Sequence, residues 1–136
     1  MRHLLAMPFA CAVIVACATS AAPHPAGPFT LARGASVLVA RGVTVTFDAV
    51  EDSRCPPGVQ CIWAGKLSYR FSIRRGDAAP ETFTLSPAQL EAAPATLGGR
   101  RIVLDADTIP PAPPQGAAID YRATFSILPS QPDQST

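Results

Sequence analysis

The residues of this sequence that could do chemistry gather around two cysteines, Cys55 and Cys61, which five residues separate. A redox-active dithiol usually has two residues between its cysteines, and a zinc site needs histidine or further cysteines close by. The nearer of the two histidines, His24, lies far upstream in the chain. The pair therefore predicts a disulfide, with neither a metal nor a cofactor, in a protein of an oxidising compartment.

The segment between the cysteines is suited to reversing the chain. Pro57-Gly58 fits a type II turn, because proline fixes its own φ and glycine accepts the positive φ that follows. A bridge around so short a loop contributes about 2 kcal/mol by chain entropy. Two uses of the loop stay open: a structural staple with Trp63 packed in the core, or a recognition loop that presents Arg54 and Trp63.

The beginning of the chain has the three-part layout of an export signal. A short basic start is followed by an apolar run over 4–16 and then by small residues. The run is shorter than the roughly 20 residues that a membrane-spanning helix needs. We therefore expect a signal peptide over residues 1–16, and no permanent membrane span.

The run ends Ile14-Val15-Ala16-Cys17, which resembles the lipobox of bacterial lipoproteins. The resemblance implies that the Cys17 thiol is lipidated and becomes the first residue of an envelope protein, on the periplasmic side of an outer membrane. Acyl chains contribute about 0.8 kcal/mol per buried CH₂. Cleavage after Ala21 or Ala22 is the alternative, and it would leave a soluble periplasmic or secreted protein.

Downstream of the signal, composition divides the chain into three parts. Residues 17–28 are small and rich in proline, which indicates a flexible tether. Residues 29–128 are expected to form one β domain, and the polar, unpatterned stretch 129–136 a disordered tail.

Alternation of apolar and polar residues dominates the β domain. Its clearest example is the segment 67–74, where four apolar residues alternate with serine and arginine. Only 87–93 looks helical, with Ser86 as N-cap and Pro87 at the first helical position. The pattern predicts an all-β fold, a small sandwich or partly open barrel of 6 or 7 mostly antiparallel strands. The remaining strand candidates are 36–40, 43–48, 81–85, 100–106 and 119–127.

Charges in the sequence are balanced, with 11 Lys and Arg against 10 Asp and Glu, which gives no case for nucleic acid as a partner. The outward positions of 67–74 hold Arg70 and Arg74, and those of 119–127 hold Arg122. If these two strands are neighbours, the three arginines form a patch that could grip phosphate or polysaccharide carboxylate.

Carboxylates form two further groups that could do acid–base chemistry or bind calcium. Asp48, Glu51 and Asp52 precede the cysteine loop, and Asp105 and Asp107 are spaced to share one face of a strand. These groups support a second hypothesis, a carboxylate- or calcium-dependent enzyme. A third is a protease inhibitor that presents the disulfide loop.

The stretch D-S-R-C-P, a few residues, then C-x-W-A-G resembles a family of small exported bacterial proteins and lipoproteins without an established activity. Nine residues carry the resemblance, which implies a β domain and an exported life and names no reaction. They are Asp52, Ser53, Arg54, Cys55, Pro56, Cys61, Trp63, Ala64 and Gly65.

Together, these features favour a lipid-anchored, monomeric β domain without catalysis, which binds an envelope protein or a glycan.

Overall fold

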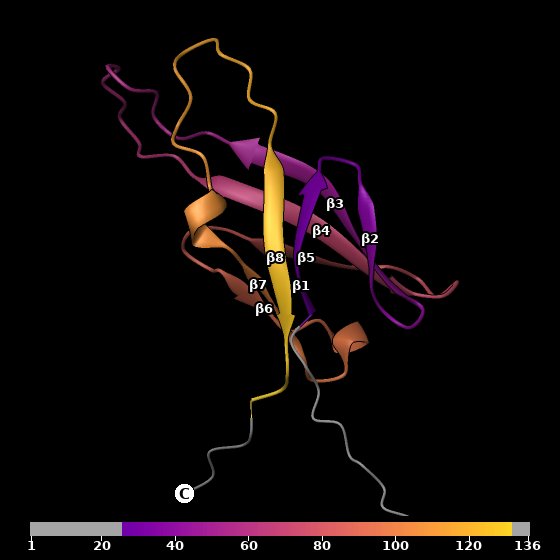
Figure 1. The fold of residues 1–136 in the computed structure, drawn as a ribbon. Coiled ribbons are helices and arrows are strands. Elements are labelled where there is room, and N and C mark those ends of the chain that lie inside the picture. Colours follow the sequence, from indigo (N-terminus) through magenta and orange to yellow (C-terminus); the bar gives the residue numbers. More distant parts are fainter. Residues whose placement is uncertain (1–25, 132–136) are drawn as a thin grey trace, which may run out of the picture.

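The computed structural model describes residues 26–131, which form a β-sandwich (Figure 1). Two four-stranded antiparallel sheets pack face to face, with the strand orders β1-β8-β7-β6 and β2-β3-β4-β5. This confirms the predicted all-β sandwich, with eight strands in residues 26–131 where 6 or 7 were expected. The first sheet consists of β1 (Ala26–Ala32), β8 (Arg122–Leu128), β7 (Arg101–Leu104) and β6 (Glu91–Ala92). The second consists of β2 (Ser36–Ala40), β3 (Val43–Asp52), β4 (Leu67–Arg75) and β5 (Glu81–Leu85).

Period-two alternation builds the core between the sheets. On β4 the apolar residues are buried and the serines and arginines between them face outward. Phe71 lies at the centre, with its ring centroid 5.2 Å from that of Phe47 in the same sheet and 5.8 Å from that of Phe125 in the other. Aromatic pairs at these separations contribute beyond the apolar area that they bury.

A β-bulge in β3 changes which residues face the core. Val43, Val45 and Phe47 are buried in alternation, and the register with β4 then shifts between Phe47 and Ala49. The extra residue reverses the alternation, so that Asp52 pairs with buried Leu67. The bulge thus turns the carboxylate of Asp52 toward the space between the sheets.

The helix expected over 87–93 is wrong. Ser86 and Gln89 instead bond to each other, N–H to C=O in both directions at 3.0 Å, and β6 follows at once. A helix of two turns is marginal without tertiary packing. Here Glu91 and Ala92 instead pair with the edge of β7.

Several boundaries also differ from the expected ones. The strand β1 was not among the candidates, and it begins at Ala26, inside the range predicted as a tether. The strand β3 runs on to Asp52, and β8 starts only at Arg122. Two short 3₁₀ helices, η1 (Ala95–Leu97) and η2 (Ala106–Thr108), flank β7. The predicted signal peptide, Cys17 and residues 132–136 lie outside the described residues.

Candidate functional site

Residues 53–66, which we call the stapled loop, extend the β3–β4 hairpin beyond the body of the sandwich (Figure 1). The hairpin pairing continues into the neck of the loop. Ser53 N–H donates to the Lys66 carbonyl at 2.8 Å, Lys66 N–H donates to Ser53 Oγ at 3.0 Å, and Cys55 N–H donates to the Ala64 carbonyl at 3.3 Å. A hairpin neck of this kind holds the base of the loop in one register.

The predicted disulfide between Cys55 and Cys61 is confirmed, with Cα atoms 5.9 Å apart. Between the cysteines, Val59 N–H donates to the Pro56 carbonyl, and Gly58 has a φ of 75°. These are the features of the type II turn that Pro57-Gly58 predicts. The upper part of the loop is therefore fixed by a covalent bridge and an internal turn.

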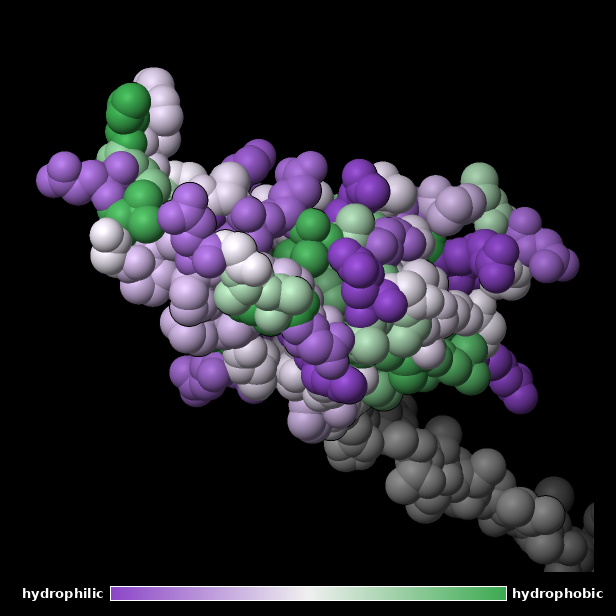
Figure 2. Space-filling model, turned by 90° about the horizontal axis from the view of Figure 1, so that it is seen from above, coloured by the Kyte–Doolittle hydropathy of each residue, from purple (hydrophilic) through white to green (hydrophobic). Residues whose placement is uncertain are grey.

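The loop exposes large apolar side chains. Ile62 is 93% exposed, Trp63 82% and Val59 39%. Of the two uses of the loop that the sequence left open, the one with Trp63 packed in the core is therefore wrong, because the hairpin neck carries Trp63 beyond the sheets. The loop projects at the upper left of Figure 1, and Figure 2 shows a projection with hydrophobic residues on the same side.

The first residues of the loop are held by a network that we call the Asp52 clamp. The Arg54 guanidinium donates to both carboxylate oxygens of Asp52, from Nε at 2.9 Å and from NH2 at 2.7 Å. Arg54 NH1 donates to the Pro110 carbonyl at 2.8 Å, and Tyr121 Oη donates to Asp52 Oδ2 at 2.6 Å. Pro110 and Tyr121 belong to the long connection between η2 and β8, so the clamp ties the stapled loop to the opposite sheet.

The pKa values in the clamp follow from its hydrogen bonds and from its burial. The Asp52 side chain is 7% exposed and that of Arg54 20%. The hydrogen bonds from Arg54 lower the pKa of Asp52 to about 2, and burial, with the bond to Asp52, raises the pKa of Tyr121 to about 12. Asp52 is thus ionised and Tyr121 protonated over the whole physiological range. Arg54, a candidate for recognition, has its guanidinium engaged within the protein.

Gly65 closes the neck of the loop and is required there. Its φ is 69°, and a Cβ atom at this position would lie 1.8 Å from the Ser53 carbonyl oxygen. No side chain larger than hydrogen fits without displacing the neighbouring backbone. This steric restriction explains why the W-A-G sequence ends in glycine.

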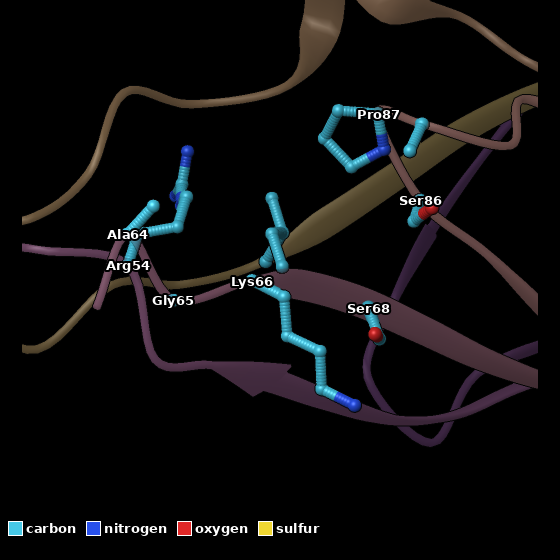
Figure 3. Close-up of a pocket in the computed structure, with 9 residues that line it drawn as sticks. Arg54, Ala64, Gly65, Lys66, Ser68, Ser86 and Pro87 are labelled. Atoms are coloured by element: carbon cyan, nitrogen blue, oxygen red, sulfur yellow. The ribbon is translucent and has the colours of Figure 1, made fainter.

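A hollow of about 500 Å³ lies beside the neck (Figure 3). Its walls come from the neck, the start of β4 and the Ser86–Gln89 turn, and they are mainly apolar. In Figure 3, Lys66 and Ser68 point to one side of β4, and Arg54 and Pro87 lie on the other. The residues that line the hollow are Arg54, Ala64, Gly65, Lys66, Leu67, Ser68, Ser86, Pro87 and Ala88.

The carboxylates singled out in the sequence do not converge. Asp52 faces the interior, whereas Glu51 faces outward and Asp48 accepts a hydrogen bond from Ser72 Oγ at 3.1 Å. Asp105 and Asp107 lie at the start of η2, where Asp105 Oδ1 accepts from the Asp107 N–H, so the prediction that they share a strand face is wrong. Within residues 26–131, no three His, Cys, Asp or Glu side chains are grouped so as to hold a metal ion.

The predicted patch of three arginines is not formed, because one of them, Arg122, lies apart from the other two. Arg70 and Arg74 lie on β4, but Arg122 lies on β8 in the other sheet and pairs with Asp120 at 3.2 Å. Strand neighbours cannot be read from one strand's pattern, since sheet order is a tertiary property. Within residues 26–131, no helix is long and apolar enough to cross a membrane.

No protein-family model matches the chain, and the comparisons with curated proteins and with solved structures also gave no match. The resemblance of the cysteine motif to small exported bacterial proteins stays a prediction. Sequence reasoning missed Ile62 and the clamp partners Pro110 and Tyr121. Ile62 lies in the stapled loop rather than in a strand, so no alternation pattern marked its exposure in the sequence.

Proposed function

We propose that this protein is a non-catalytic binding module of the bacterial envelope, lipid-anchored through Cys17, that recognises a partner with Ile62 and Trp63, which we call the tip of the stapled loop. The observation that carries the proposal is the exposure of Ile62 and Trp63 on a loop closed by a disulfide. Aromatic residues dominate the energetics of protein interfaces.

The two exposed side chains of this tip contribute no free energy of burial to the fold. Burying an isoleucine side chain contributes about 2 kcal/mol, and a tryptophan buries still more area. The chain instead presents Ile62 and Trp63 next to each other, whereas most of its other large apolar residues are buried in the sandwich. A partner that covers both side chains would gain this free energy on binding.

Rigidity supports the same proposal. The disulfide, the hairpin neck and the Asp52 clamp hold the loop before any partner arrives. Ordering a flexible loop costs binding free energy, so a loop ordered in advance binds more tightly for the same contacts. In this proposal Arg54 is a positioning residue that aligns the loop, and Trp63 and Ile62 make the contacts.

Placement of the loop fits an anchored protein. The start of β1 at Ala26 and the end of β8 at Leu128 lie at the lower end of the sandwich in Figure 1, and the stapled loop lies at the upper end. An anchor upstream of β1 would leave the tip free to meet an envelope protein or a glycan. Intact mass of the membrane-extracted protein tests the anchor, because lipidation predicts a diacyl or triacyl mass on a chain that begins at Cys17.

Recognition is tested by photo-crosslinking in cells with benzoylphenylalanine in place of Ile62. Ala93, which is exposed directly after β6 in the first sheet, gives the control position. We expect a discrete crosslinked adduct from position 62 and none from position 93, and loss of the adduct in Trp63→Ser. Equal labelling from both positions, or none from position 62, would contradict recognition by the tip.

A protease inhibitor is a second candidate, because the same exposed and stapled loop could occupy a protease cleft. This role predicts that the purified protein inhibits a serine protease and that Trp63→Ser relieves the inhibition. An adduct from position 62 without inhibition of any protease in a broad panel would decide for a binding module.

A further inference from the structure

The outer face of the second sheet has a composition different from that of the stapled loop. On β4 the outward residues are Ser68, Arg70, Ser72 and Arg74. Their cross-strand neighbours on β3 and β5 include four threonines, so hydroxyl groups border both arginines along the strand. These threonines are Thr44, Thr46, Thr82 and Thr84.

Two hollows follow this face. One, of about 200 Å³, is lined by Ala49, Glu51, Lys66, Ser68, Arg70 and Thr84. The other, of about 230 Å³, is lined by Ser36, Thr44, Thr46, Ser72, Arg74 and Pro80. At about 3.3 Å per residue, the outward row from Ser68 to Arg74 is about 20 Å long. The hollows therefore succeed one another along β4, each with an arginine in its wall.

The cationic side chains on this face are exposed and form no ion pair within the described residues, so a ligand can reach them. Lys66, Arg70 and Arg74 are exposed, and they take part in none of the three ion pairs formed within residues 26–131. The face also holds two carboxylates: Glu51 shares a hollow with Lys66 and Arg70 and takes part in none of these ion pairs, and Asp48 accepts a hydrogen bond from Ser72 Oγ. The three cations therefore exceed the carboxylates of this face by one charge. Guanidinium groups bind carboxylates through two parallel hydrogen bonds, so both arginines can each hold one acid group.

From these observations we infer that the outer face of β3-β4-β5 binds a linear acidic polysaccharide along β4. Its carboxylates lie on Arg70 and Arg74, and its hydroxyl groups bond to Ser68, the threonines and Glu51. A hydroxylated, negatively charged chain matches a row in which hydroxyl and guanidinium groups alternate. An anionic membrane surface is disfavoured because the hollows are concave and Leu38 is the single large apolar residue exposed on this face in the described chain.

The test uses the full chain and three uronate polymers: polygalacturonate, alginate and hyaluronate. Binding is measured by isothermal titration at low salt, with dextran as the neutral polymer. We expect at least one uronate polymer to bind, dextran not to bind, and Arg70→Gln/Arg74→Gln to weaken binding about tenfold or more. Affinity should also fall as salt rises, since ionic contacts are screened.

A double variant of equal charge, Arg101→Gln/Arg122→Gln, is the matched control, because both arginines lie on the first sheet, Arg101 on β7 and Arg122 on β8. It should bind within about twofold of the unaltered protein, since its charge change is the same but its contacts are intact. Thermal unfolding of both variants checks that each is folded. Trp63→Ser should leave binding unchanged, which separates this surface from the stapled loop.

Three results would overturn the inference. The first is that no uronate polymer binds. The second is that both double variants lose affinity equally, which would reduce the effect to net charge. The third is that phosphatidylglycerol vesicles bind with the Arg70 and Arg74 dependence and the polymers do not, which would assign the face to lipid headgroups.

Discussion

Asp52→Asn is the sharpest test of the Asp52 clamp, because asparagine has the shape of a protonated aspartate and lacks its charge. The Asp52 carboxylate accepts two bonds from the Arg54 guanidinium and one from the Tyr121 hydroxyl, in a site that is almost closed to water. The substitution removes the negative charge and retains the volume. Its effect on the free energy of unfolding therefore measures how much the negative charge of Asp52 stabilises the fold.

The size of the effect follows from the pKa. The folded protein lowers the pKa of Asp52 from 3.8 to about 2, and at 1.36 kcal/mol per unit this is about 2.5 kcal/mol of stability at neutral pH. A lowered pKa stabilises the fold above the unfolded value and loses that effect as the pH falls toward the folded value. The difference between the two proteins should therefore be about 2.5 kcal/mol at pH 7, about 1.3 at pH 3 and about 0.4 at pH 2.

Urea denaturation at these three pH values, followed by far-UV circular dichroism with the disulfide intact, gives the required free energies. Asp120→Asn is the control, since Asp120 pairs with Arg122 on the surface and its side chain is 76% exposed. It should change stability by less than about 1 kcal/mol. A difference for Asp52→Asn that is absent at pH 7, or that stays constant down to pH 2, would refute the assigned role of the carboxylate.

Three more outcomes are expected. Absorbance titration of the native protein should show Tyr121 ionising near pH 12 rather than near 10. The stability that Tyr121 contributes should be present below pH 10 and lost between about pH 10 and 12. Ionisation of Tyr121 near pH 10 in the folded state would contradict its bond to the clamp. Gly65→Ala should destabilise the protein far more than Gly58→Ala in urea unfolding, because both glycines have positive φ but only Gly65 faces a backbone clash. Equal losses of about 1 kcal/mol in the free energy of unfolding would show that the neck can adjust. Replacing Cys55 and Cys61 together by serine should cost about 2 kcal/mol and leave the sandwich folded, and a loss of β structure by circular dichroism would show that the bridge supports more than its loop.

Trp63 allows a direct check of the loop, since it is the single tryptophan of the chain. Its fluorescence should be that of indole in water and should be quenched efficiently by iodide in the native protein, because the side chain is 82% exposed. A blue-shifted, protected emission would place Trp63 in the core and remove the main support for recognition by the tip.

Local patterns in the sequence were sufficient for much of this structure. Alternation along 67–74 predicts which side chains of β4 are buried, since each side chain of a strand faces one of two sides. The spacing of Cys55 and Cys61, with Pro57-Gly58 between them, predicts a stapled turn, because short-range geometry decides both. These features depend on residues within a few positions of one another.

Other features depended on contacts between distant residues. One added residue at the β3 bulge turns Asp52 inward, where Tyr121, 69 positions later, reaches it from the connection that leads into β8. The separation of Arg122 from Arg70 and Arg74 follows from strand order, and the exposure of Trp63 from how far the hairpin extends beyond the sheets. The sequence by itself determined six of the eight strands, the staple and the β class, because local sterics and burial alternation decide them. Only the tertiary structure decided which charges meet and which apolar side chain stays in water, because those depend on the packing of two sheets against each other.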